Sequence, residues 1–382
     1  METDDQDRAS CTLREAEYED CEPATALLRE LGLVIPGQRD DIRSHWRRFW
    51  IDNPALAVAE SPPGRGWLLE DDGAMVGFFG NVPLLYDYAG QPVIVACASK
   101  WGVAKPYRSE TARLADCYFK QKNVDLLLVT TGIKPTGRIF RRYGGLPVPQ
   151  PAYDHILFWI LDPAAYLKAG LIRKGTGPRT ASLACRLGGP VLTAITRMAK
   201  SNRIIQKTKI DIVEIGRIDD EFDDLWRRKR DEANRFYACR SAECLRWHFG
   251  AASLAEKTRI LVCRTARGLG GYVAVMREDV PEIGLKRLKI VDLFVANNDE
   301  NVIDNLLQAA REVGISDGCH VLELIGLPIG LRQEIIRRQA PWSRKMPVWP
   351  VFYKGLTDDF RQPSGSEDFW YVTAYDGDTA IF

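Results

Sequence analysis

The chain has 382 residues, of which 46% are hydrophobic and 27% are charged, and its formal net charge at pH 7 is +1. This length predicts two domains, and the near-zero net charge excludes a chain-wide attraction to nucleic acid. The nine cysteines and four histidines lack metal-ligand spacing, so we expect no metal site.

The N-terminal segment is acidic and lacks the basic and apolar regions of a signal peptide. No stretch approaches the roughly 18 consecutive apolar residues of a membrane-spanning helix. The cysteines form no CxxC pair, which favours reduced thiols. We therefore expect a cytoplasmic protein.

Hydrophobic periodicity predicts a mixture of strands and helices in the first half of the chain. A strand is followed by two helices and three strands, and then by a helix, a strand, a helix and a strand. In chain order these predicted elements are 11–14, 22–31, 42–50, 66–70, 75–86, 93–103, 109–122, 124–130, 135–142 and 155–161.

The second half repeats this order of elements almost completely. Its predicted strands and helices, in chain order, are 210–215, 220–235, 242–249, 258–264, 271–277, 288–295, 300–313, 321–325 and 331–338. A repeated order of elements indicates two copies of one fold.

A basic turn lies where the strand 93–103 meets the helix 109–122. Lys105, Arg108 and Arg113 surround it, and the N–H groups and dipole of a helix N-terminus attract anions, so the turn predicts a phosphate site. Alternatively, Ser109 only caps the helix and the cations are solvated.

The corresponding turn of the second half carries acidic residues instead. Asp299 and Glu300 suit a helix N-terminus as caps, but they would repel a phosphate. We therefore expect the anion site in the first half only.

The repeated plan, together with the segments VACASKWGVAKPYRSETARLADCYFKQ and IFRRYGG, resembles the GNAT superfamily of N-acetyltransferases in its tandem form. The resemblance implies an α/β fold (mixed α+β) of two tandem acyl-CoA N-acyltransferase-like domains. Each would be a curved, mostly antiparallel sheet flanked by helices. The implied parts are 1–162 with the coenzyme site, a basic interdomain segment 163–208, and 209–382 as a degenerate copy.

The resemblance also implies that acetyl-CoA or another acyl-CoA binds at the basic turn, without a metal. Arg108 matches the leading Arg of the family's loop, whereas Thr111 and Arg113 stand where its glycine and its glycine or alanine belong. The implied coenzyme contacts are Val103, Lys105, Arg108, Ser109, Glu110, Thr111, Ala112 and Arg113.

The implied catalytic groups depart from the family pattern. Phe140 occupies the position of the family's proton-donating tyrosine and cannot donate a proton, so Tyr143 or a water would substitute. Ser99 and Lys100 precede the turn, and as alternating strand residues only one of them can point into the cleft.

Four residues are candidate substrate contacts. Thr130 and Thr131 replace the family's amide-bearing residue after its fifth strand. His45 and Trp46 lie on a helix that borders the acceptor cleft in this family. The alternative for that helix is an aromatic stripe that faces the core.

The segment 163–210 contains ten Lys or Arg and no Asp or Glu. Apolar residues recur between 183 and 198 at helical spacing, which is typical of an amphipathic surface helix. We expect peripheral contact with an anionic membrane at its inner face, or with a phosphate-bearing acceptor. The alternative is an interdomain linker.

These features predict an enzyme that moves an acetyl or longer acyl group from acyl-CoA to an amine. The acceptor would be a small molecule, an amino sugar or a lipid-linked amine, as in surface-polysaccharide or lipid biosynthesis. One alternative is a Fem-type transferase that uses aminoacyl-tRNA, although the basic segment lacks the interleaved aromatic residues of RNA-binding surfaces. Another is a non-catalytic, degenerate binding protein.

Overall fold

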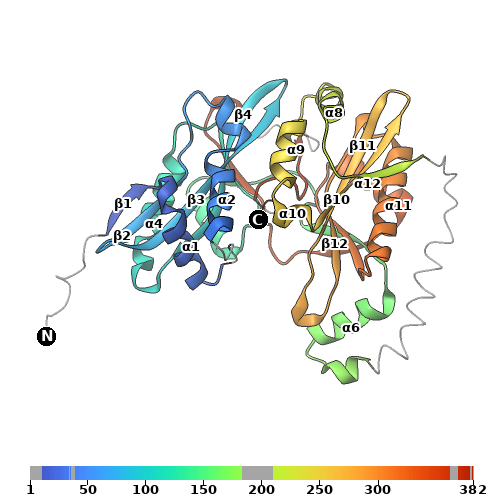
Figure 1. The fold of residues 1–382 in the computed structure, drawn as a ribbon, viewed down its shortest axis with the longest axis horizontal. Helices are drawn as coiled ribbons and strands as arrows, with labels where there is room; N and C mark the ends of the chain where they lie inside the picture. The colour runs from blue at the N-terminus through green and yellow to red at the C-terminus, as the bar shows by residue number, and fades with distance from the viewer. Residues whose placement is uncertain are drawn as a thin grey trace.

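A computed structural model describes residues 11–33, 35, 39–182, 210–361, 369–378 and 381. Within these residues the strands form two neighbouring sheets, each flanked by helices (Figure 1). Antiparallel pairs dominate both sheets, which confirms the predicted mixed α/β class with two sheet domains. The helix predicted between 183 and 198 lies outside the described residues.

The first sheet contains nine of the described strands. Most of them follow one path, in the spatial order β1 (Thr12–Glu15), β2 (Gly66–Asp71), β3 (Ala74–Tyr88), β4 (Gln91–Val103), β5 (Leu126–Val129), β15 (Phe352–Gly355) and β6 (Leu146–Pro147). β9 (Phe236–Ala238) pairs with β3, and β16 (Trp370–Tyr371) pairs with β9. β4 and β5 are parallel.

The second sheet contains seven of the described strands. Their spatial order is β14 (Trp342–Lys345), β7 (His155–Ile160), β13 (Val321–Leu324), β12 (Arg287–Val295), β11 (Gly268–Arg277), β10 (Thr258–Thr265) and β8 (Ile212–Ile215). β12 and β13 form the parallel pair here, as β4 and β5 do in the first sheet.

The two halves of the chain exchange strands. β7, which the sequence places at the end of the first repeat, lies in the second sheet between β13 and β14. In return, β15 enters the first sheet between β5 and β6. The predicted ranges 1–162 and 209–382 therefore each contain a strand that belongs to the other sheet.

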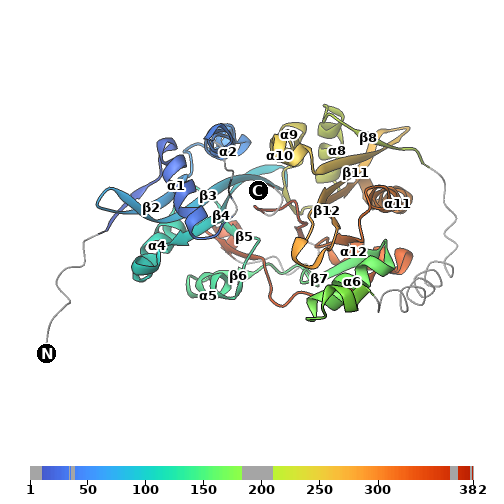
Figure 2. The ribbon, with the colours of Figure 1, turned by 60° about the horizontal axis from the view of Figure 1, so that its bottom comes forward.

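Helices cover both faces of the sheets (Figure 2). Those of the first half are α1 (Cys21–Glu30), α2 (Arg39–Trp50), α3 (Pro54–Val58), α4 (Thr111–Lys120) and α5 (Lys134–Arg142), with α1 and α2 on one face and α4 and α5 on the other. α6 (Pro163–Arg173) begins the interdomain segment. The helices of the second half are α8 (Glu221–Arg230), α9 (Ala242–Phe249), α10 (Ala252–Ala255), α11 (Glu300–Ser316), α12 (Ile329–Gln339) and α13 (Asp358–Arg361). The short 3-10 helices are η1 (Tyr18–Asp20), η2 (Lys105–Glu110), η3 (Pro281–Ile283) and η4 (Ala296–Asn298).

The hydrophobic core joins the two halves. One cluster of buried side chains runs from α1 and α2 across the first sheet and into the second half. A separate cluster fills the space under α4 and α5, where Phe140 packs against Phe119 and Phe352. Phe352 belongs to β15, so this second cluster needs a side chain from the C-terminal half.

Candidate functional site

The parallel strands β4 and β5 diverge midway along β4. They pair only from Val95 to Cys97, although β4 continues to Val103. Residues 98–103 pair with β3 on one edge, and on the other edge they have no strand partner in the described structure. A gap between diverging strands leaves polar backbone groups of a strand edge open to a ligand.

Two connected cavities occupy this gap. The outer cavity, of about 370 Å³, lies among the end of β4, the η2 turn and α5, and Val103, Arg108 and Thr111 line it. The inner cavity, of about 360 Å³, lies deeper between β4 and the end of β5. Trp101 and Thr136 line both cavities, so together they form one continuous groove.

Ser99 and Lys100 both line the inner cavity, contrary to the expectation that only one could face it. The reason is a β-bulge: Ser99 pairs with Gly80 and Trp101 with Phe79, so Lys100 is the extra residue. Lys100 has a φ of 48°, in the left-handed region. Burial lowers the pKa of its ammonium group, and Asp378 opposes that shift.

The carboxylate in the inner cavity comes from the other end of the chain. Asp378 lines this cavity and is only 8% exposed. It accepts hydrogen bonds from Thr130 Oγ1 at 3.1 Å and from Thr131 Oγ1 at 3.4 Å. Burial raises the pKa of Asp378, while Thr130 and the Lys100 cation act in the opposite direction. A buried carboxylate with a raised pKa can accept a proton near neutral pH.

The preceding residues hold Asp378 in place. Gly377 has a φ of 76°, and a Cβ on it would lie 2.2 Å from Thr130 Oγ1, so only glycine fits. Asp376 accepts a hydrogen bond from Tyr86 at 2.9 Å and lies 3.6 Å from the buried Arg240. Burial raises the pKa of Asp376 to about 6.

The basic turn is a 3-10 helix, η2, that runs directly into α4. The sequence predicts free N–H groups at this turn. The N–H groups of Tyr107 and Thr111 instead donate to the carbonyls of Ala104 and Arg108, so these two are not available to a phosphate. Arg108 lines the outer cavity. The turn therefore offers a phosphate mainly positive charge, and fewer free N–H groups than the sequence predicts.

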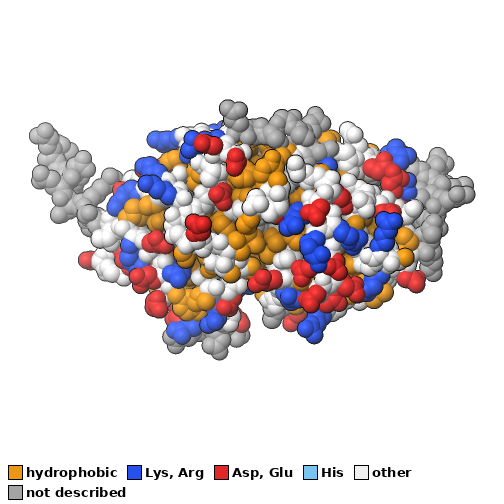
Figure 3. Space-filling model, turned by 90° about the horizontal axis from the view of Figure 1, so that it is seen from above, with side chains coloured by type: hydrophobic (Ala, Val, Ile, Leu, Met, Phe, Trp, Pro, Cys, Tyr) orange, Lys and Arg blue, Asp and Glu red, His pale blue; other side chains and the backbone are white. Residues whose placement is uncertain are grey.

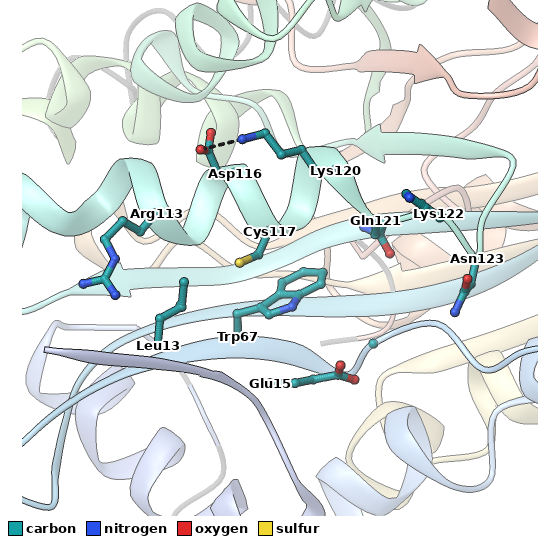
Figure 4. Close-up of a pocket in the computed structure, with 11 residues that line it drawn as sticks. Leu13, Glu15, Trp67, Arg113, Asp116, Cys117, Lys120, Gln121, Lys122 and Asn123 are labelled. Carbon is teal, nitrogen blue, oxygen red and sulfur yellow. Dashed lines mark hydrogen bonds and ion pairs between the residues drawn. The ribbon is translucent and has the colours of Figure 1, made fainter.

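Arg113 points to a different side of α4. Its guanidinium forms an ion pair with Glu110 at 3.0 Å and donates to the Cys11 carbonyl at 2.9 Å. It lines a cavity of about 530 Å³ between α4 and strands β1 and β2, with Trp67 and Cys117 (Figure 4). Arg108 and Arg113 are thus not brought together.

The other predicted coenzyme contacts lie around the turn. Lys105, Ser109 and Ala112 are exposed, and Ser109 Oγ lies 3.4 Å from Glu110 Oε1. Val103 and Thr111 line the outer cavity. The coenzyme roles assigned to all these residues remain predictions.

Tyr143 lies outside the lining of both cavities. Its hydroxyl donates to Asp116 Oδ1 at 2.5 Å, its ring stacks on Phe119, and burial and Asp116 raise its pKa to about 12. Phe140 is fully buried in the core beneath α5. This geometry does not favour the predicted role of Tyr143 as the proton donor.

Of the two predicted substrate residues of α2, Trp46 faces the core and His45 is half-buried. Trp46 is 2% exposed and donates to Thr25 Oγ1 at 2.8 Å. His45 packs edge-on against Trp46 and Phe49, and burial, with Lys100 and Arg48 nearby, lowers its pKa to about 3. Thr130 and Thr131, in contrast, meet Asp378 at the inner cavity.

The equivalent gap of the second half is filled by protein. β12 pairs with β13 only as far as Ile290, and the buried Arg240 binds Asp292 beyond that point at 2.8 and 3.0 Å. Tyr371 donates to the Leu293 carbonyl at 2.6 Å. The same C-terminal segment therefore plugs the second gap and carries Asp378 into the first.

The turn before α11 is also occupied by acidic side chains. Asp299 accepts from the N–H groups of Asn301 and Val302, and Glu232 accepts from the N–H group of Asn297. The protein's own carboxylates thus take the place that a phosphate would need.

Sequence reasoning missed Asp378 as a site residue. It lies far along the chain from β5, and nothing in its local pattern reports the contact. The adjacent Gly377 was a weak signal, because an Asp-Gly pair often marks a turn with a left-handed backbone.

Further observations concern metal ions, membrane-spanning helices, the molecular surface and the cysteines. Among the described residues, no cluster of three or more His, Cys, Asp or Glu side chains is placed to hold a metal ion, and no helix is long and apolar enough to cross a membrane. Figure 3 shows one face on which cationic and anionic side chains alternate around a central apolar area. All described cysteines are free thiols.

No protein-family model and no curated protein sequence matches the chain significantly. Solved structures do resemble it. A conserved protein from Enterococcus faecalis V583, described as a probable N-acyltransferase, has a TM-score of 0.58 and 10% identity over 91% of this chain and 72% of that chain. A GCN5-related N-acetyltransferase from Kribbella flavida has a TM-score of 0.54 and 12% identity over 91% and 71% of the two chains.

Saccharomyces cerevisiae N-myristoyltransferase, solved with bound myristoyl-CoA, has a TM-score of 0.51 and 13% identity, over 90% of this chain and 78% of that chain. These similarities confirm the fold expected from the sequence, that of acyl-CoA N-acyltransferases.

Proposed function

We propose that the protein transfers an acyl group from acyl-CoA to an amine in the groove of the first half. The observation that carries this proposal is the open edge of β4 beside a cavity that contains a buried carboxylate. The fold of the structural neighbours supports it, since those proteins include a probable N-acyltransferase, an N-acetyltransferase and an N-myristoyltransferase solved with bound myristoyl-CoA.

The donor would lie in the outer cavity. Amide groups of the pantetheine arm can pair with the free edge of residues 98–103 as an added strand would. Arg108 at the mouth can bind a phosphate of the coenzyme. This places the thioester carbonyl in the inner cavity.

Asp378 would act as the general base. The amine nitrogen attacks the thioester carbon, the C–N bond forms, and Asp378 accepts the proton that the nitrogen loses. The C–S bond then breaks, and the coenzyme thiolate takes a proton from Lys100, whose pKa burial lowers. A proton returns from Asp378 to Lys100, directly or through solvent, and restores both groups.

The test is a thiol-release assay with acetyl-CoA and a panel of primary amines. Asp378→Asn keeps the shape of the side chain, so it should still bind the coenzyme while kcat falls by about 100- to 10,000-fold. Asp211→Asn, at an exposed position before β8, serves as the control. Wild-type rates in the Asp378→Asn variant would refute the role of Asp378, and no coenzyme binding by the wild type would refute the function.

The finer features of the proposal rest on the sequence. The resemblance supports an amino-sugar or lipid-linked acceptor, and the ten cations of the segment 163–210 support its recruitment to an anionic membrane. Sedimentation with anionic and neutral vesicles at low and high salt tests the membrane contact, because salt should weaken it.

A further inference from the structure

A fourth cavity, of about 390 Å³, lies between α5 and the segment 348–352 of the C-terminal half. We call it the basic cavity; Arg138 and Arg141 line it from α5, and Trp349 and Phe352 from the segment. Its two walls are held together closely: Gly132 donates its N–H to the Pro350 carbonyl at 2.8 Å.

The charge of this cavity is strongly positive. Lys134, Arg138 and Arg141 line it, all three are exposed, and none of them forms an ion pair with a carboxylate in the described structure. The Arg141 guanidinium lies 5.2 Å from the centre of the Phe352 ring, which holds it at the cavity wall.

The sequence around both walls contains no compensating acid. Neither 126–153 nor 335–357 includes an Asp or Glu. Three neighbouring cations carry more positive charge than the single negative charge of a carboxylate can balance. A phosphate monoester carries about −1.5 to −2 charges, and it can accept two parallel hydrogen bonds from one guanidinium group. The cavity therefore suits a phosphate.

The basic cavity adjoins the reaction centre. Ile133, at the start of α5, lines both the inner cavity and the basic cavity, whereas Thr136 joins the inner cavity to the outer one. The three cavities thus form a series around α5. When the donor fills the outer cavity, the basic cavity is a neighbouring space from which an acceptor can reach the thioester.

We propose that the basic cavity binds a phosphate group of the acceptor, so that the substrate is an amine that also carries a phosphate. The amine would enter the inner cavity beside Asp378, and the phosphate would stay with Arg138 and Arg141. This inference rests on the proposed function, since it takes the inner cavity as the place of acyl transfer.

The test is calorimetric titration of inorganic pyrophosphate into the full chain, with and without saturating coenzyme A. We expect binding in both conditions, at least tenfold weaker in the double variant Arg138→Gln/Arg141→Gln. The control double variant Arg217→Gln/Arg267→Gln removes two exposed cations elsewhere and should bind within twofold of the wild type.

Three results would overturn the proposal: no pyrophosphate binding by the wild type, equal binding by both double variants, or loss of pyrophosphate binding when coenzyme A is present. The last result would assign the cations to the coenzyme. Failure of the proposed function gives a different result, because a wild type that binds no coenzyme A can still be titrated with pyrophosphate.

A soluble phosphate and a lipid phosphate headgroup share this chemistry. Sedimentation with phosphatidic acid vesicles, compared with phosphatidylcholine vesicles, separates the two sources. Vesicle binding that Arg138→Gln/Arg141→Gln abolishes supports a lipid-linked acceptor, and pyrophosphate binding without vesicle binding supports a soluble one. Binding to neither overturns the proposal.

Discussion

Asp378 and Lys100 lie far apart in the sequence but both line the inner cavity, and each shifts the pKa of the other. Burial raises the pKa of Asp378 and lowers that of Lys100, whereas their mutual attraction opposes both shifts. The pair can therefore hold a carboxylate that is ready to take a proton and an ammonium that is ready to give one.

Removing the Lys100 charge should change the pH dependence of the reaction. The rate rises with pH as Asp378 loses its proton, and the nearby cation favours the ionised carboxylate. Lys100→Met should raise the pKa of Asp378 and move this acidic limb to higher pH, whereas Lys100→Arg should leave the limb near its wild-type position. Profiles of kcat/KM against pH measure the shift, and identical limbs in the three proteins would contradict it.

At the scale of elements, the segment 369–378 links the two halves to the site. It pairs with β9 through β16, hydrogen-bonds to the loop before β7 through Gln150, and ends at Asp378. Gly377 is the residue that fits this segment under Thr130. A change there should act on both stability and activity.

Gly377→Ala tests the fit of this segment. The left-handed backbone costs alanine about 1–2 kcal/mol, and the clash with Thr130 adds to that cost and displaces Asp378. Gly318 has a φ of 64° but no atom within 4 Å of an added Cβ, so Gly318→Ala carries the strain without the clash. Chemical denaturation should show the larger loss of stability for Gly377→Ala, and only that variant should lose activity. Equal losses would mean that the contact with Thr130 is unimportant.

At the scale of the molecule, the exchange of β7 and β15 makes each sheet depend on both halves. Arg48 adds a second link between the two halves. Its guanidinium donates to the carbonyls of Trp247 and Ile381 at 3.0 and 3.1 Å. The ranges 1–162 and 209–382 therefore describe repeats of the sequence, and we propose that they fold as one cooperative unit.

Cleavage of the chain between the repeats tests this cooperativity. A protease site inserted after residue 195 should give two fragments that co-elute under native conditions and unfold in one transition, since each sheet keeps its exchanged strand. Size-exclusion chromatography and calorimetry provide the readout, with the uncut inserted protein as the control. Fragments that separate without denaturant would contradict the proposal.

The sequence predicts the order of elements, the fold class and the position of the basic turn, because periodicity and turn chemistry are local properties. It does not predict that β7 joins the second sheet, that a bulge turns Lys100 inward, or that Asp378 reaches β5. Each of these depends on contacts between distant segments, and such contacts leave little local trace. Arg108 and Arg113 line different cavities because the 3-10 helix η2 gives way to the α-helix α4 between them. The sequence does not predict this change of helix type.

The proposed coenzyme site is the outer cavity, which Arg108 lines and Arg113 does not. Calorimetric titration of acetyl-CoA into the wild type, Arg108→Glu and Arg113→Glu tests this placement most directly, because the two variants change charge identically. We predict binding by the wild type, at least tenfold weaker binding by Arg108→Glu (about 1.4 kcal/mol), and binding within twofold of wild type by Arg113→Glu. No binding by the wild type, or an effect confined to Arg113→Glu, would contradict the account.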